Sequence, residues 1–301
     1  MKINNYLSRQ EVAYFTAKSD VHAWRLVLGN WLAIALIFAV AATWPNPLTL
    51  VLAIVLLAGR QLGLSVLMHE CGHRTLFRTA KLNDVIGQWL CALPVMNDQP
   101  SYARGHLEHH RKAGTHEDPD LPNYQDYPVS RESFRRKMTR DLTGQTGFKL
   151  MTYIFRGASG AISREQRDSA KPFLQQLAVQ LLLFLVLYAF GIGWTWLLWA
   201  MAYLTVFMFI IRVRQVAEHA AVPDLFDPDP RRNTRTVDVP WWQRLVFAPN
   251  GVNYHMEHHF MASVPCYRLR ELREHLRLQH ALDDVPVFRG YGQVLQHAVA
   301  R

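Results

Sequence analysis

Hydrophobic residues gather in four long runs along this chain of 301 residues. The runs cover residues 26–43, 47–68, 173–190 and 194–211, and Arg60 is the one charged residue among them. Each run holds 18 to 22 residues, so that as an α-helix it would be about 27–33 Å long and would match the hydrocarbon core of a bilayer. The pattern therefore predicts four transmembrane helices and excludes a simple soluble globule.

Very short links join these runs in pairs, at residues 44–46 and 191–193. A link of three residues allows only an antiparallel hairpin, so we expect two helical hairpins with both turns on the same side of the membrane. The expected fold is a single all-α integral membrane domain over residues 1–301. Its polar segments, which would form a helical cap on the other side, are residues 1–25, 69–172 and 212–301.

The positions of lysine and arginine predict which side of the membrane the polar segments face. There are four in residues 1–25, sixteen in 69–172 and twelve in 212–301, and the two short links hold none. By the positive-inside rule the three polar segments face the cytoplasm. The net charge of +9 then reflects topology and the nearby anionic lipid surface. Because no nucleic-acid-binding module accompanies it, we expect no nucleic acid partner.

Three shorter features complete the organisation. Residues 39–41 resemble a signal-peptide cleavage site, but the polar leader is long and a second apolar run follows at once, which disfavours that interpretation. Residues 85–96 form an apolar segment too short to span, as in an interfacial or re-entrant helix. Residues 223–235 are expected to be a loop. Three scattered cysteines exclude a disulfide scaffold and suit a reducing compartment.

Nine of the fourteen histidines fall in four places within the polar segments. They are His69 and His73; His106, His109 and His110; His219; and His255, His258 and His259. Histidines four apart project from one face of a helix. His219 lies eight residues beyond the fourth run, about 12 Å away if that helix continues.

Nine nitrogen donors exceed what one tetrahedral zinc ion needs. They fit two metal ions of higher coordination number, with places left for water or O2. Imidazole alone does not identify the metal. A site where helices leave the bilayer is suited to lipid substrates, and oxidation of an unactivated C–H bond requires a redox metal such as iron with O2, since zinc has no redox chemistry. We therefore expect a di-iron centre with O2 as co-substrate, provided that the reaction is oxidative.

In this order and spacing, the histidine boxes resemble those of the membrane fatty acid desaturase superfamily, which also includes hydroxylases and carotenoid ketolases. The first box reads H-x-x-x-H and the second and third read H-x-x-H-H. The flanking residues 114–120, 253–254 and 263–267 are similar as well. The resemblance covers most of the chain and implies four membrane helices capped by a cytosolic helical domain that holds a di-iron centre.

The resemblance also implies roles for individual residues. All nine histidines would bind metal, His219 being an extra ligand after the fourth membrane helix. Gln215, one turn earlier, would hold a metal-bound water. The implied reaction introduces a double bond into the acyl chain of a lipid or of a carrier-bound substrate. Two electrons per turnover would come from an external ferredoxin or cytochrome b5, whose acidic surface would suit the basic cytoplasmic face. We expect a bacterial cytoplasmic membrane, or the endoplasmic reticulum in a eukaryote.

Carboxylates beside the boxes are candidates for orienting the histidines. A carboxylate that accepts the outer imidazole N–H fixes the tautomer and raises the basicity of the ligand. The alternative is an ordinary solvated helix charge. The candidates are Glu70, Glu108, Glu218, Glu257, Asp118 and Asp120.

Three other functions stay open. A lipid or carotenoid hydroxylase or ketolase of the same superfamily would use the same metal centre. His69-Glu70-x-x-His73 also matches the zinc metalloprotease motif, with Glu70 as general base, which would leave most of the clustered histidines without a role. A histidine-rich metal transporter would need ionisable residues within the spans, which are almost free of them.

Overall fold

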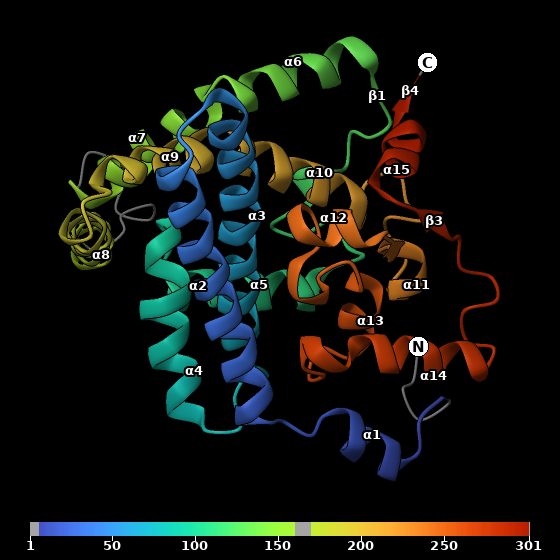
Figure 1. Cartoon of the computed structure of the whole chain (residues 1–301). Coiled ribbons are helices and arrows are strands. Elements are labelled where there is room, and N and C mark those ends of the chain that lie inside the picture. Colours follow the sequence, from blue (N-terminus) through green and yellow to red (C-terminus); the bar gives the residue numbers. More distant parts are fainter. Residues whose placement is uncertain (1–5, 160–169, 301) are drawn as a thin grey trace.

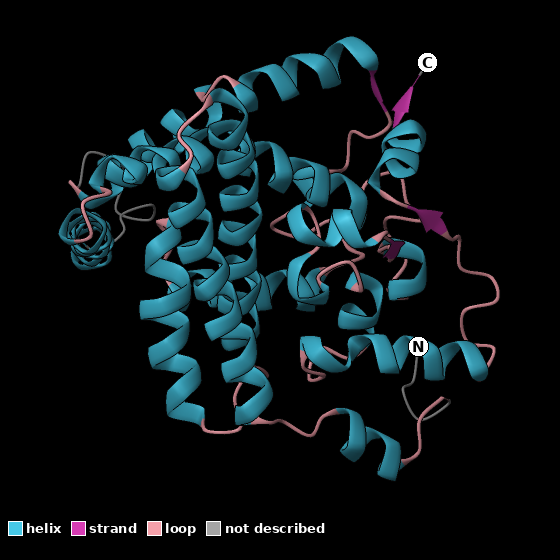
Figure 2. Cartoon of the chain, viewed as in Figure 1, coloured by secondary structure: helices cyan, strands magenta, loops and turns pink. Residues whose placement is uncertain are grey.

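The computed structural model describes residues 6–159 and 170–300, and these residues are mostly helical (Figures 1 and 2). Strand structure in this part consists of four segments of two residues each. Four helical stretches are long and apolar enough to cross a membrane, which confirms the predicted fold class. They contain α2 (Asp20–Thr43), α3 (Pro47–Gly72), α8 (Ala170–Ala189) and the continuous stretch Gly193–His219.

The first hairpin is defined by capping residues at its turn. Asn46 precedes α3 and accepts hydrogen bonds from the backbone N–H groups of Leu48 and Thr49 at 3.1 and 3.2 Å. Pro47 occupies the first helical position, where its missing N–H costs nothing. These residues end one helix and begin the next within three positions, and α2 and α3 lie side by side in Figure 1.

The fourth helical stretch runs beyond its apolar sequence. It comprises η6 (Gly193–Thr195), α9 (Trp196–Ala202), the π-helical turn η7 (Tyr203–Phe207) and α10 (Met208–His219). The predicted span ended at residue 211, and the helix continues for eight more residues to His219. In Figure 1, α8 is seen end-on while α9 and α10 run across the view. The second pair therefore lies at a large angle, and the antiparallel hairpin expected from its short link is not formed.

The short apolar segment 85–96 is helical but irregular. It comprises the end of α4 (Ala80–Ile86), the π-helical η2 (Gly87–Ala92) and the 3-10 turn η3 (Leu93–Val95). The Trp31 indole of α2 donates to the Leu90 carbonyl at 3.1 Å, and the Gln180 amide of α8 donates to the Pro94 carbonyl at 2.8 Å. The segment is thus held against the membrane helices on two sides.

The remaining elements form the cap; most lie beside α3, while α6 and α7 pack against η7 (Figure 1). Residues 223–235 were expected to be a loop, but they include one helical turn, α11. Asp229 caps its N-terminus by accepting a hydrogen bond from the backbone N–H of Arg231. Two parallel pairs, β1 with β4 and β2 with β3, tie the C-terminal segment to the cap. The cap helices are α1 (Arg9–Phe15), α5 (Gln99–Lys112), α6 (Arg131–Leu142), α7 (Gln145–Ala158), α11 (Pro230–Asn233), α12 (Trp241–Val246), α13 (His255–Phe260), α14 (Leu269–Leu278) and α15 (Tyr291–Ala298). The 3-10 turns are η4 (Leu121–Asn123), η8 (Pro249–Gly251) and η9 (Cys266–Arg268), and the strands are β1 (Val129–Ser130), β2 (Val237–Asp238), β3 (Phe288–Arg289) and β4 (Val299–Ala300).

Two apolar clusters adjoin the C-terminal half of α3. One packs α2, α3, α9 and η7 around buried residues such as Leu57, Leu62 and Trp199. The other joins the end of α3 to α13 and α14, with Met68 and Met256 fully buried. The end of α3 that carries the first histidine box is therefore held between the membrane helices and the cap.

Candidate metal centre

Four helices bring the nine clustered histidines together. His69 lies in the last turn of α3, and His73 is the C-cap residue of that helix. His219 is the last residue of α10. The other two boxes lie on short helices, α5 with His106, His109 and His110, and α13 with His255, His258 and His259.

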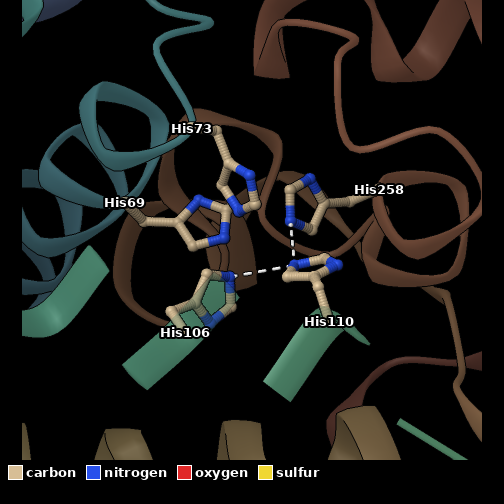
Figure 3. A group of neighbouring side chains, drawn as sticks. All are labelled: His69, His73, His106, His110 and His258. Atoms are coloured by element: carbon tan, nitrogen blue, oxygen red, sulfur yellow. Dashed lines mark hydrogen bonds between the residues drawn. The ribbon is translucent and has the colours of Figure 1, made fainter. Parts of the chain in front are cut away.

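The imidazole nitrogens form two neighbouring groups. His69, His73, His106, His110 and His258 form the first, in which the ligand atoms all lie within 4.8 Å of one another. Figure 3 shows their rings turned toward a common centre. His109, His219 and His259 form the second group under the same limit. His255 adjoins it, since its Nε2 lies 2.9 Å from Nε2 of His219.

The nitrogen atoms at this centre fit bound metal ions. Nε2 of His73 and Nε2 of His259 are buried and have no hydrogen-bond partner among the residues that the structure describes. Nε2 of His110 lies 3.0 Å from Nε2 of both His106 and His258. Buried nitrogens without partners are costly in a folded protein, and facing ring nitrogens at this spacing need a cation or a shared proton between them. Two metal ions would satisfy both requirements.

The environment keeps six of these imidazoles neutral, which is the form that binds metal. Burial, together with the neighbouring His69, lowers the pKa of His73 to about 2. Burial and the neighbouring histidines lower the pKa of His110 to about 2 as well. The same causes lower the pKa values of four other box histidines well below their usual range, namely His106, His255, His258 and His259.

Two of the candidate carboxylates orient a histidine directly. Asp118 Oδ1 lies 2.8 Å from Nδ1 of His109, and Tyr124 donates its hydroxyl hydrogen to the other oxygen. Gly114, with φ of 82°, makes the turn that returns the chain to His109. Glu70 Oε1 lies 3.1 Å from Nδ1 of His69. Both carboxylates are buried, and each leaves Nε2 of its histidine to face the metal centre.

Two further carboxylates lie farther from a ring. Asp120 is 3.8 Å from Nδ1 of His109, and Glu218 is 3.8 Å from Nδ1 of His255 while it pairs with Arg214. His219 has a backbone partner instead of a carboxylate, since its Nδ1 lies 3.2 Å from the carbonyl oxygen of Asn233. The sequence did not predict this partner. A carbonyl acceptor carries no signature in the side-chain sequence.

For the other two carboxylates the structure corrects the expectation. Glu108 is partly exposed and pairs with Lys112 at 3.0 Å and with Arg111, because it lies on the outer side of α5. Glu257 is fully buried, but it accepts a hydrogen bond from Arg273 at 2.6 Å and another from Thr236. It joins α13 to α14 and to the residue before β2, and within the described part of the chain its hydrogen bonds go to these two residues and not to a histidine.

A cavity of about 520 Å³ borders the centre. Gln215 lines it, and so do Arg214 and Glu218 from the same helix. The histidines that line it are His69, His106, His109, His219, His255 and His258. Its apolar lining comes from α3, η3, α7, η7 and α10, with Val66, Val95, Leu150, Phe207, Met208 and Ile211.

Comparisons with known proteins agree with this geometry. Residues 45–291 match the family described as fatty acid desaturase. The chain is also 25% identical over 243 residues to dihydrorhizobitoxine desaturase from Bradyrhizobium elkanii, an alignment that covers 76% of this chain and 67% of the relative. Membership of this family indicates an oxidoreductase. Because the match covers most of the chain and includes all nine clustered histidines, this protein belongs to the fatty acid desaturase family.

Proposed function

We propose that this protein is a membrane desaturase that uses two iron ions and O2 to introduce a double bond into the acyl chain of a lipid or carrier-bound substrate. The meeting of nine histidines in two adjacent groups beside a partly apolar cavity supports the proposal most strongly. The relative from Bradyrhizobium elkanii is itself named a desaturase, which favours desaturation over hydroxylation.

In this proposal the two groups of histidines hold one iron ion each. His255 joins the second group through its contact with His219. When bound, the iron pair supplies the redox chemistry with O2 that removes hydrogen from an unactivated carbon chain. The overall reaction converts –CH2–CH2–, O2, two electrons and two protons into –CH=CH– and two molecules of water.

The residues of the chain hold and orient the reactants. Asp118 and Glu70 fix the rings of His109 and His69, so that their Nε2 atoms face the centre. The apolar wall of the cavity would hold an acyl chain with one C–C bond beside the histidines and would exclude bulk water. Gln215 is positioned to donate or accept a hydrogen bond within the cavity.

Electrons would enter from the opposite side of the centre. His73 and His110 do not line the cavity, but they line a shallow hollow on the outer face of α5. The hollow is also lined by Arg104, Leu107 and Arg111, and by Glu108, which pairs with Arg111. In our proposal an acidic ferredoxin or cytochrome b5 docks on this hollow, on the cytoplasmic side of a bacterial membrane. Charge complementarity would mainly increase the rate of encounter.

A hydroxylase or ketolase of the same superfamily is the second candidate, since it would use the same centre and cavity. A zinc protease is disfavoured by the position of Glu70. Its Oε1 faces His69, and its Oε2 accepts hydrogen bonds from Thr75 and from the backbone of Cys266 at 2.9 and 2.8 Å. A general base would need a free carboxylate facing substrate water.

Metal and product analysis test the proposal together. The full chain is expressed in membranes, its metal content is measured after purification, and the lipids are profiled by mass spectrometry after incubation with O2 and a reductant. We expect about two iron ions per chain and products that lack two hydrogens. Products with an added oxygen would establish the hydroxylase, whereas one zinc ion per chain with peptide release would overturn the proposal.

A further inference from the structure

A short helix of the cap packs against the middle of a candidate membrane helix. A Cβ atom at Gly59 of α3 would lie 2.6 Å from the carbonyl oxygen of Leu245 and 2.9 Å from Cα of Val246. Both are backbone atoms of α12 and have little freedom to move away, so glycine is required. One turn later, Cβ at Gly63 would lie 2.2 Å from Oδ1 of Asn30. The sequence of α3 is therefore adapted to this contact.

Polar side chains surround this contact between α3 and α12. Arg60 donates hydrogen bonds to the Leu245 carbonyl at 2.7 Å and to Oδ1 of Asn30 at 3.2 Å. Asn250, which follows α12, donates to the Gly63 carbonyl at 2.9 Å. The single charge of the second apolar run thus has partners from both α2 and the cap.

Arg60 lies well inside the second apolar run, residues 47–68. Arg60 is thirteen residues after Pro47, which corresponds to about 20 Å along α3. A bilayer core is about 30 Å thick. The unpaired backbone groups at the ends of the six-residue helix α12 are costly among lipid tails, which favours a lipid boundary near Arg60 on this side of α3.

The outward face of α12 has the composition of a membrane-interface anchor. Trp241, Trp242 and Leu245 are 74%, 52% and 46% exposed. Arg244 is also exposed, and within the described residues its guanidinium makes no hydrogen bond or ion pair. The amide of Gln243 faces inward and accepts from Tyr291 N at 3.1 Å. Tryptophan favours the headgroup level of a bilayer, and a neighbouring arginine reaches lipid phosphate.

We propose that this face of α12, formed by Trp241, Trp242, Arg244 and Leu245, inserts into the headgroup region of the phospholipid bilayer. The surface is continuous with α3, a candidate membrane span against which α12 is packed. Insertion on this side would set the height of the metal centre above the lipid. His69 lies nine residues beyond Arg60 on α3, about 14 Å farther from the membrane along the helix.

Depth-dependent quenching tests this placement in the full chain. The three native cysteines are buried, so a single introduced surface cysteine can be labelled selectively with an environment-sensitive fluorophore. The test variant is Trp241→Cys, and Trp242→Cys repeats the measurement if the first folds poorly. Glu117→Cys, at a side chain 75% exposed, is the water control, and Leu36→Cys, at a residue 56% exposed on α2, is the lipid control.

The labelled variants are reconstituted into phosphatidylcholine–phosphatidylglycerol vesicles with nitroxides at the headgroup or at mid-chain. For Trp241→Cys we expect at least about twofold stronger quenching by the headgroup nitroxide than by the mid-chain nitroxide. Glu117→Cys should respond to neither, and Leu36→Cys mainly to the mid-chain nitroxide. The proposal is overturned if Trp241→Cys behaves like either control.

Shielding from water without quenching by either nitroxide would also overturn it and would indicate a protein contact, such as a second copy of the chain. The measurement uses no substrate, iron or reductant. Its failure is therefore distinguishable from failure of the proposed desaturase function.

Discussion

A histidine binds a metal ion only through an unprotonated nitrogen, and the ring must point that nitrogen at the ion. Burial supplies the first condition here, since it lowers the pKa values of six box histidines, His73, His106, His110, His255, His258 and His259. Hydrogen bonds to the outer nitrogen supply the second, through Asp118 at His109 and Glu70 at His69. These two features lead to two predictions for single residues.

His219→Ala should remove one ligand of the second group although it lies outside the three boxes. We expect the iron content to fall from about two ions toward one per chain, and turnover to fall by more than about 100-fold. Metal analysis and product formation measure this. His116→Ala is the control, because its ring stacks on Phe226 and belongs to neither group. Full iron content in His219→Ala would remove His219 from the ligand set.

Asp118→Asn should weaken metal binding while preserving the shape of the site. The amide carries no charge to polarise the His109 ring, so we expect a loss of about 10–100-fold in iron affinity. Titration of the metal-free protein with ferrous iron would measure it. Asp120→Asn serves as the comparison, since Asp120 is 3.8 Å from the same nitrogen. This substitution should reduce the iron affinity less. Equal effects of the two substitutions would contradict the assigned role.

At the scale of elements, close helix contacts decide which parts of the chain meet. The extension of α10 past the apolar run carries His219 to α13, and the glycines of α3 admit α12. Both contacts join segments that are far apart in the sequence.

Gly59→Ala should destabilise the protein because the new Cβ meets the backbone of Leu245 at 2.6 Å. We expect a loss of about 1–3 kcal/mol, as for other overpacked contacts. Gly29→Ala on α2 is the matched control, with nothing within 4 Å of its Cβ, and should be neutral or stabilising by up to about 1 kcal/mol. Thermal unfolding in detergent compares the two, and equal melting temperatures would argue against the tight contact at Gly59.

The stability of the folded protein depends on pH through its buried histidines. Unfolded histidine has a pKa of about 6.5, whereas folded His73 and His110 have pKa values of about 2. Below pH 6.5 the unfolded chain takes up protons that the folded chain excludes. The stability due to neutral histidines is therefore fully present above pH 6.5 and decreases as the pH falls toward 2.

We therefore predict that the metal-free protein loses stability steeply between pH 7 and 5. Each such histidine contributes up to about 1.4 kcal/mol per pH unit below 6.5. Melting temperatures across this range would show it, and reloading with iron at each pH provides the comparison, because the metal stabilises the neutral rings. A melting temperature of the metal-free protein that did not change with pH would contradict the shifted pKa values.

The charge on the outer face of α5 leads to a prediction about the electron donor. Arg104→Glu with Arg111→Glu should raise the KM for a reduced plant-type ferredoxin by about 10-fold or more, while turnover with dithionite stays unchanged. Binding of a redox-inactive gallium-substituted ferredoxin should weaken in parallel. Arg135→Glu with Arg140→Glu changes the same charge on the exposed face of α6. An equal loss in both double variants would indicate only a general charge effect.

The sequence by itself determined the four long apolar helices, the clustered histidines and the family. Long apolar runs make helices whatever the rest of the chain does, and histidine spacing of three and four reports a shared helix face. These are local properties, set by residues within one or two turns.

Only the tertiary structure decided which histidines share a group, because each group draws on separate segments: His69, His106 and His258 meet from three helices. It also decided that Glu70 faces a histidine, while Glu108 pairs with Lys112 and Arg111 at the surface of α5 and Glu257 faces Arg273. All three glutamates stand next to or between box histidines, and each helix turns its own side chains through about 100° per residue. Which of those directions points inward depends on how the helices pack, and that is set by contacts between segments more than two hundred residues apart in the sequence, such as Asn30 with Asn250.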